Sequence, residues 1–130
     1  MQKNKLNTNS NILVSFKSHS EISKKNVRLV DILDLKNPDN GSLGEWKLSD
    51  IKKVVKAFGN EKFISATIGD ILDLEKIIKK IKVFDELKLD FIKFGLFVEN
   101  TVQMSKFLAD IKSCNFKTEL VPVVFADKKI

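Results

Sequence analysis

Two lysines lie in segments that are otherwise almost entirely apolar. Lys36 ends the segment 30–36 (VDILDLK), and Lys93 lies inside the segment 90–97 (DFIKFGLF). Burial of an ammonium group costs free energy, so such a lysine reaches water, pairs with an acid or loses its proton. A lysine without its proton attacks a carbonyl carbon to form a Schiff base, and a second lysine can exchange protons with the adduct. The two lysines therefore favour carbonyl chemistry.

Asp34 precedes Lys36 by two residues. Side chains alternate along a strand, so Asp34 and Lys36 are expected on one side of it, about 6–7 Å apart. Side chains from alternate strands of a parallel barrel share an interior layer. If Lys36 lies on the second strand and Lys93 on the fourth, we expect the two lysines to face each other near the C-terminal mouth.

A simpler interpretation remains open for both lysines. Their aliphatic stems would pack at an edge of the sheet while the ammonium groups reach water. This interpretation suits Lys36, at the end of its segment. It suits Lys93 less well, because Phe91, Ile92 and Phe94 flank that residue.

Two loops contain further candidate binding residues. Gly41 and Ser42 lie in the glycine-rich loop 40–44 (NGSLG), whose backbone N–H groups could bind an anion, although a plain turn is the alternative. Asp70 follows the apolar segment 63–69, at a position where active-site loops of parallel barrels begin. Asp70 could instead cap the helix that follows.

Other chemistry has little support in the sequence. His19 has no second histidine or cysteine at ligand spacing, so we expect no metal site. Cys114 has no nearby histidine to activate it, which favours packing over catalysis. Neither of the glycine motifs GxxxxGK[ST] and GxGxxG, which are typical of nucleotide-binding proteins, is present.

The elements that position these residues alternate between strands and helices. Short apolar runs predict five strands, at 11–16, 29–36, 63–69, 90–97 and 119–125. Ser18 and Glu21 form a capping-box pattern that predicts the start of a first helix. Apolar residues at helical spacing predict three more helices, within 48–58, 74–81 and 101–111. The fifth strand has the weakest support, because Pro122 cannot donate a ladder hydrogen bond.

This alternation predicts an α/β fold in which helices cover a parallel sheet. The units of about 25–30 residues match those of a TIM (β/α)8 barrel, which needs roughly 250 residues for eight units. The chain has 130 residues. We therefore expect a partial TIM (β/α)8 barrel of about five parallel strands and four helices over residues 11–130, after a polar N-terminal extension, residues 1–10.

Composition excludes several classes of partner. The net charge is +6, from 23 basic and 17 acidic residues, but Arg28 is the one arginine and tyrosine is absent. Arginine forks and interleaved aromatic residues serve nucleic-acid recognition, so we expect no nucleic-acid partner. No apolar run reaches the roughly 18–20 residues of a membrane span, and the polar start lacks a secretory signal. With one cysteine, these features predict a cytoplasmic protein.

Four short motifs resemble those of a known enzyme family. The runs 31–38 (DILDLKNP), 41–44 (GSLG), 65–70 (SATIGD) and 91–96 (FIKFGL) occur in the order and at the spacing of the (5-formylfuran-3-yl)methyl phosphate synthase family. That family is also called 4-(hydroxymethyl)-2-furancarboxaldehyde-phosphate synthase. The resemblance covers about residues 11 to 127. It implies a TIM-barrel lyase without a cofactor, which condenses two molecules of glyceraldehyde 3-phosphate to a furan aldehyde phosphate on the route to methanofuran.

The resemblance also implies roles for Lys36, Lys93 and Asp34. Lys36 matches the family's Schiff-base lysine, Lys93 matches its proton acceptor, and Asp34 matches the acid two residues before the first lysine. In the family the barrel continues through three more strands that bear phosphate-binding loops. A five-strand sheet cannot close an eight-strand barrel. We therefore expect a homo-oligomer, or a partner chain that completes the barrel. The alternative function is a non-catalytic or partner-dependent module that binds a phosphorylated metabolite.

Overall fold

The computed structural model describes residues 6, 8, 10–97 and 100–125 of the chain. Its centre is one parallel sheet of five strands in sequential order: β1 (Leu13–Phe16), β2 (Ile32–Leu35), β3 (Phe63–Thr67), β4 (Phe91–Leu96) and β5 (Glu119–Val124). Each strand is hydrogen-bonded in parallel to the next along the chain. The predicted five-strand parallel sheet is therefore confirmed. Most of the extension 1–10, and residues 126–130, lie outside the described residues.

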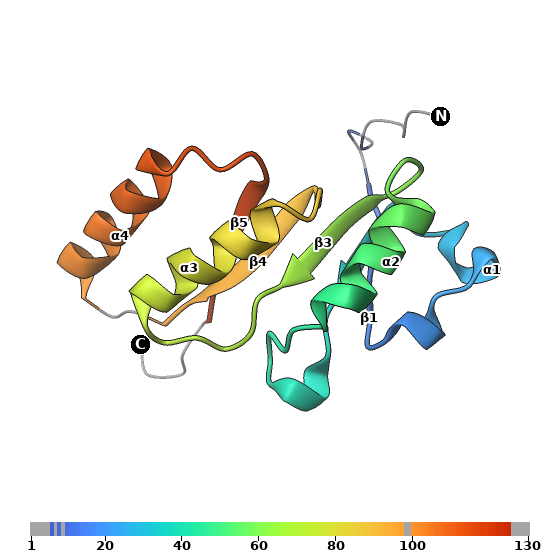
Figure 1. Cartoon of the computed structure of the whole chain (residues 1–130), viewed down its shortest axis with the longest axis horizontal. Coiled ribbons are helices and arrows are strands. Elements are labelled where there is room, and N and C mark those ends of the chain that lie inside the picture. Colours follow the sequence, from blue (N-terminus) through green and yellow to red (C-terminus); the bar gives the residue numbers. More distant parts are fainter. Residues whose placement is uncertain (1–5, 7, 9, 98–99, 126–130) are drawn as a thin grey trace.

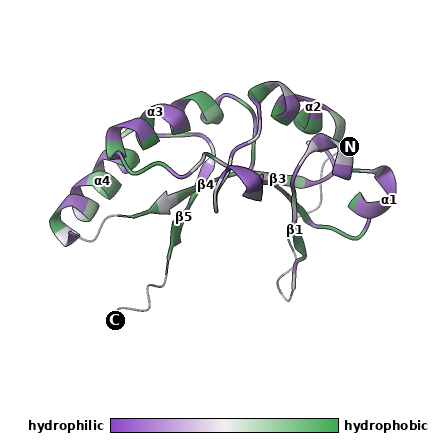
Figure 2. Cartoon of the chain, turned by 90° about the horizontal axis from the view of Figure 1, so that it is seen from below, coloured by the Kyte–Doolittle hydropathy of each residue, from purple (hydrophilic) through white to green (hydrophobic). Residues whose placement is uncertain are grey.

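Helices connect the strands. They are α1 (Lys24–Val27), α2 (Leu48–Phe58), α3 (Leu74–Asp85) and α4 (Thr101–Ser113), and two 3-10 turns cover His19–Glu21 and Pro38–Asn40. Figure 1 shows this succession along the chain. Helices α2, α3 and α4 arch along one face of the sheet, as Figure 2 shows, and no helix of the described part covers the opposite face. This arrangement is that of a partial α/β barrel.

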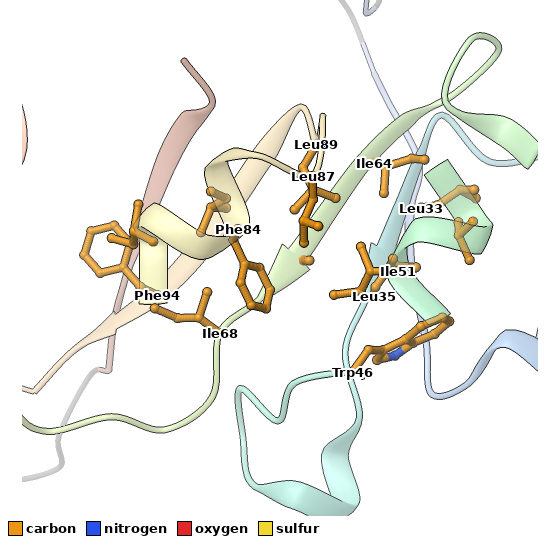
Figure 3. Close-up of a cluster of buried hydrophobic side chains, with 14 of the residues drawn as sticks. Leu33, Leu35, Trp46, Ile51, Ile64, Ile68, Phe84, Leu87, Leu89 and Phe94 are labelled. Carbon is orange, nitrogen blue, oxygen red and sulfur yellow. The ribbon is translucent and has the colours of Figure 1, made fainter. Parts of the chain in front are cut away.

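The hydrophobic core lies between the sheet and these helices. Alternate residues of the strands, such as Leu33, Ile64 and Phe94, face Ile51 of α2 and Phe84 of α3 (Figure 3). The remaining strand positions point to the uncovered face of the sheet. The strand sequences thus divide their side chains between a packed core and an open face, and the candidate site lies on the open face.

Side chains cap the two helices that follow β3 and β4. The Asp73 carboxylate accepts hydrogen bonds from the Glu75 and Lys76 N–H groups, 2.9 and 3.2 Å long, at the start of α3. Asn100 binds the first turn of α4 in the same way. The cap of α3 is therefore Asp73, which leaves Asp70 free for another role.

The expected start of the first helix was wrong. Ser18 precedes only a 3-10 turn and makes no side-chain cap, because its hydroxyl pairs with that of Ser20. Ser23 forms the capping box instead, with Asn26 as its partner, and α1 is a single turn. The second strand is also shorter than expected: it begins at Ile32, because the chain before it turns.

Pro122 lies within β5, opposite Phe94 of β4. This strand is at an edge of the described sheet, so the missing N–H of proline breaks no ladder with a further strand. The β1 strand forms the other edge. The fifth strand is confirmed, and both edges offer backbone groups to further strands.

Asp85, at the end of α3, holds the start of β5 in place. Its carboxylate accepts hydrogen bonds from the N–H groups of Lys117 and Thr118, at 3.2 and 2.8 Å. Partial burial works to raise the pKa of Asp85, but the hydrogen bonds from Thr118 and Lys117 outweigh it and hold the pKa below its ordinary value. Asp85 therefore joins α3 to β5 as a carboxylate.

Across the described ranges, no helix is long and apolar enough to cross a membrane.

Candidate active site

A buried carboxylate lies at the centre of the open face. Asp34 on β2 is fully buried and stands between Ser15 of β1 and Ser65 of β3 in the strand register. The Ser15 hydroxyl donates to Asp34 Oδ2 at 2.8 Å, and the Ser65 hydroxyl donates to Asp34 Oδ1 at 2.6 Å. A buried carboxylate is stable only when its oxygens have donors, and the two serines supply them from both neighbouring strands.

Lys93 completes this network from β4. Its Nζ lies 3.2 Å from Asp34 Oδ2, and one fifth of the Lys93 side chain is exposed. Of the three possibilities for a lysine in an apolar strand, the structure shows pairing with an acid. The two oxygens of Asp34 thus accept three hydrogen bonds, from Ser15, Ser65 and Lys93.

Lys36 lies at the end of β2, one residue beyond its last register pair. Its N–H still donates to the Phe16 carbonyl of β1, at 3.1 Å. The register Leu35↔Ala66 places Lys36 beside Thr67, and Thr67 is the register partner of Lys93. Two strand spacings separate the Cα atoms of the two lysines by about 10 Å. Lys36 and Lys93 therefore lie at the same level of the sheet, meaning the same position in the strand register, with Thr67 between them.

The ammonium group of Lys36 differs from that of Lys93 in its surroundings. The Lys36 residue is half-buried, yet its ammonium makes no ion pair or hydrogen bond with any other residue that the structure describes. Lys36 and Asp34 belong to the same face by strand alternation. One level of the sheet thus holds a paired lysine and an unpaired one.

The structure brings the predicted binding residues Gly41, Ser42 and Asp70 together. The Asp70 carboxylate accepts hydrogen bonds from the Ser42 hydroxyl at 3.1 Å and from the Leu43 N–H at 3.0 Å. Gly41 has φ +116°, and a Cβ there would overlap Asp70 Oδ2. Only glycine therefore fits against this carboxylate. Asp70 fastens the loop after β2 to the end of β3, and contact with a substrate remains a prediction for all three.

Apolar groups cover the C-terminal end of the open face. Phe97 follows β4 and Phe125 follows β5, and their rings stack with centroids 5.0 Å apart and planes at 12°. A Cβ at Gly95 would lie 2.6 and 2.7 Å from two Phe97 ring carbons and 3.0 Å from Leu43 Cδ1. The absence of a side chain at Gly95 is what admits the Phe97 ring.

Sequence reasoning missed the two serines. Each is a polar residue on a strand, at the level of Asp34, and that alternation is the signal that could have found them. What the sequence lacks is the register between strands, which alone shows that Ser15 and Ser65 flank the same carboxylate. Within residues 10–97 and 100–125, no cluster of three His, Cys, Asp or Glu side chains could hold a metal ion.

Comparison with known proteins identifies the family. Residues 12–130 match the family described as 4-HFC-P synthase. Two curated relatives are each called (5-formylfuran-3-yl)methyl phosphate synthase. The relative from Methanobrevibacter smithii is 31% identical over 90 residues, which cover 66% of this chain and 37% of the relative. The relative from Archaeoglobus fulgidus is 41% identical over 63 residues, which cover 46% of this chain and 26% of the relative.

The matches thus span about a third of the length of these relatives, or less. The family match, in contrast, covers nearly the whole chain and includes the paired lysine, the unpaired lysine and the buried aspartate. The chain belongs to the 4-HFC-P synthase family.

Proposed function

We propose that this chain supplies the Schiff-base site of a (5-formylfuran-3-yl)methyl phosphate synthase. The reaction would condense two molecules of glyceraldehyde 3-phosphate, on the route to methanofuran. The observation that carries the proposal is the Lys93–Asp34 ion pair, together with an unpaired Lys36 at the same level of the sheet as Lys93. Family membership supports the same activity.

Lys36 is the nucleophile in this proposal. Its unpaired ammonium group loses a proton, and the neutral amine attacks the aldehyde carbon; a C–N bond forms, the C=O π bond breaks, and the proton released from the nitrogen balances the one taken up by the oxygen. Loss of that oxygen as water leaves an iminium on Lys36. The iminium withdraws electrons from the neighbouring carbon, so the lyase chemistry needs no metal and no organic cofactor.

Lys93 moves the protons. As an ammonium it can donate a proton to the departing oxygen, and as the resulting amine it can accept one from the carbon next to the iminium. Asp34 is fully buried, and both its oxygens already accept hydrogen bonds from Ser15, Ser65 and Lys93, so it does not face the substrate. We assign Asp34 the role of holding Lys93 in position and in its charged form.

The loop after β2 would form one wall of the substrate site. Asp70 fixes this loop above β3 through Ser42 and the Leu43 N–H. Gly41 and Ser42 would then lie close to the phosphorylated end of the aldehyde. The Asp70 carboxylate already holds the Leu43 amide, so the phosphate would use the remaining donors of this loop.

Further strands would complete the barrel. The described sheet has free edges at β1 and β5 and an open face with exposed apolar residues such as Leu13 and Val121. Eight parallel strands close a barrel of this type. We propose that the other strands come from a partner chain or a second copy, and that the assembly works in the cytoplasm without a nucleic-acid or membrane partner.

A trapping experiment tests the Schiff base. The protein is incubated with glyceraldehyde 3-phosphate, reduced with borohydride and examined by intact mass and peptide mapping. We expect an adduct on Lys36 that Lys36→Ala and Lys36→Arg abolish, since arginine keeps the charge but forms no imine. Lys79→Ala, on the exposed side of α3, is the matched control and should keep the adduct.

The alternative function is a module that binds a phosphorylated metabolite without catalysis. The free edges of the described sheet favour it, because five parallel strands alone do not close an eight-stranded barrel. A folded protein that binds glyceraldehyde 3-phosphate, in wild-type and Lys36→Arg forms alike, but yields no adduct would replace the Schiff-base proposal with this one.

A further inference from the structure

Asp34 has two lysines on its face of the sheet, and it pairs with the more distant one. Lys36 lies two residues along the same strand, so the Cα atoms of Asp34 and Lys36 are about 6–7 Å apart. Lys93 lies two strands away and one side-chain step nearer the C-terminal ends, about 12 Å from Asp34 between Cα atoms. Nevertheless the Lys93 Nζ is 3.2 Å from Asp34 Oδ2, and the Lys36 ammonium has no partner among the described residues. Distance along the sheet therefore does not decide which lysine is paired.

The donors around Asp34 all come from other strands. Oδ2 accepts a hydrogen bond from the Ser15 hydroxyl of β1 at 2.8 Å and one from Lys93 of β4 at 3.2 Å. Oδ1 accepts a hydrogen bond from the Ser65 hydroxyl of β3 at 2.6 Å. Both carboxylate oxygens thus have donors without any contribution from Lys36, which follows Asp34 on its own strand.

Ser65 and Ser15 differ in whether water can replace them. Ser65 is 1% exposed, and in the described part of the chain its hydroxyl is the one donor to Oδ1. Ser15 is exposed on the edge strand β1, and Oδ2 keeps Lys93 as a second donor. A buried carboxylate oxygen without a donor is costly, because no water reaches it. Ser65 is therefore the residue whose loss would leave Asp34 in need of another donor.

We propose that Ser65 is a positioning residue that assigns the two lysines their different states. By occupying Asp34 Oδ1, it leaves Lys93 as the paired lysine and Lys36 as the unpaired one. Without the hydroxyl, Oδ1 would take the Lys36 ammonium, the other charged donor that strand alternation places on this face beside Asp34. This capture would recover only part of the lost stability, because the ammonium gives up its contact with water. The roles of nucleophile and proton carrier rest on the proposed function, whereas the assignment of the ion pair rests on the hydrogen bonds alone.

Competitive labelling of lysines measures this assignment without any substrate. The folded protein is methylated with formaldehyde and a mild borane reductant at neutral pH. The rate at each lysine is mapped by mass spectrometry, with the exposed Lys79 as internal reference. In the wild type we expect Lys36 to react roughly tenfold faster than Lys93, since a charge-assisted hydrogen bond holds the Lys93 ammonium. In Ser65→Ala the rate at Lys36 should fall roughly tenfold relative to Lys79, while the rate at Lys93 stays the same.

Further variants separate the hydroxyl of Ser65 from its volume. Ser65→Thr keeps the hydroxyl and should keep the wild-type labelling pattern. Ser65→Cys fills the same space with a weak donor and should also slow the labelling of Lys36, so it tests the inference even where the alanine variant does not fold. Ser15→Ala is the matched control on the other side of the carboxylate, and it should leave both labelling rates unchanged.

Three results would overturn the positioning role. The first is a Lys36 labelling rate that neither Ser65→Ala nor Ser65→Cys changes. The second is an equal change in Ser65→Ala and Ser15→Ala. The third is faster labelling of both Lys36 and Lys93 after loss of the hydroxyl, which would mean that Ser65 only holds the strands together.

Trapping with glyceraldehyde 3-phosphate separates this inference from the Schiff base. In folded Ser65→Ala the borohydride-reduced adduct on Lys36 should form roughly tenfold more slowly, while Ser113→Ala, at the exposed end of α4, should keep the wild-type rate. A Lys36 labelling rate that depends on Ser65, in a wild-type protein that forms no adduct, keeps the positioning role and removes the Schiff base. An adduct whose rate Ser65→Ala leaves unchanged keeps the Schiff base and removes the positioning role.

Discussion

Lys93 on β4 reaches across β3 and places its Nζ 3.2 Å from Asp34 Oδ2 on β2, although 59 residues separate the two along the chain. The contact joins a partly exposed ammonium to a fully buried carboxylate. The Ser15 hydroxyl donates to the same oxygen, and the Ser65 hydroxyl donates to Asp34 Oδ1. Side chains from four adjacent strands therefore meet at one carboxylate, and this contact fixes the position of the Lys93 side chain.

Asp34→Asn should destabilise the fold by about 2–4 kcal/mol, because it leaves the Lys93 ammonium partly buried without its counter-charge. Urea unfolding followed by circular dichroism measures the change. Asp39→Asn is the control, since it breaks an exposed pair with Lys17 and should leave stability nearly unchanged. A cost no larger than that of the control would mean that the ion pair contributes nothing.

Ser65→Ala should cost more stability than Ser15→Ala. Ser65 is buried and no water can replace its hydroxyl at Asp34, so we expect a loss of about 2 kcal/mol, the usual effect for a hydrogen bond to a charged group. Ser15 is exposed on an edge strand, where water can take over, and its loss should be about 0.5 kcal/mol.

Ser113→Ala, which removes an exposed hydroxyl at the end of α4, serves as the reference in the same denaturation series. If Ser15→Ala proved as costly as Ser65→Ala, the edge of the sheet at β1 would be closed to water, as a further strand would make it.

Gly95→Ala should destabilise the protein by about 1–3 kcal/mol, since the added methyl group overlaps the Phe97 ring and Leu43. The stacked rings of Phe97 and Phe125 should separate at the same time. Loss of the ring-current shifts between Phe97 and Phe125 in NMR spectra would report this change. Unchanged shifts in a stable Gly95→Ala protein would contradict the close approach of Phe97 to the strand.

Asp85 should make stability depend on pH in the acid range. Hydrogen bonds from Thr118 and Lys117 hold its pKa below the ordinary value in the folded protein. Its contribution is therefore complete above the ordinary aspartate pKa of about 3.9 and is lost as pH falls through the lowered pKa of the folded state.

Comparison of thermal unfolding of wild type and Asp85→Asn between neutral and acid pH measures this contribution. The difference between them should shrink as the pH falls. A constant difference would show that the carboxylate charge at Asp85 does not matter to the fold.

The sequence by itself was enough to predict the five strands and the three long helices, and to select Lys36 and Lys93 as candidate site residues. Strand alternation is a property of the covalent chain, so it was enough to place Asp34 and Lys36 on one face. The apolar residues around Lys93 showed that its side chain must reach water, pair with an acid or lose its proton. The prediction failed at Ser18, where a local pattern competed with an equally good cap at Ser23. Such choices depend on small differences in local free energy.

Only the tertiary structure decided which residues meet. The register between strands made Asp34 the partner of Lys93 and set Ser15 and Ser65 on either side of it. It also placed Asp70 under the loop after β2 and brought Phe125 onto Phe97. These contacts join segments far apart in the chain. They follow from how whole strands and loops pack, which no local pattern of residues records.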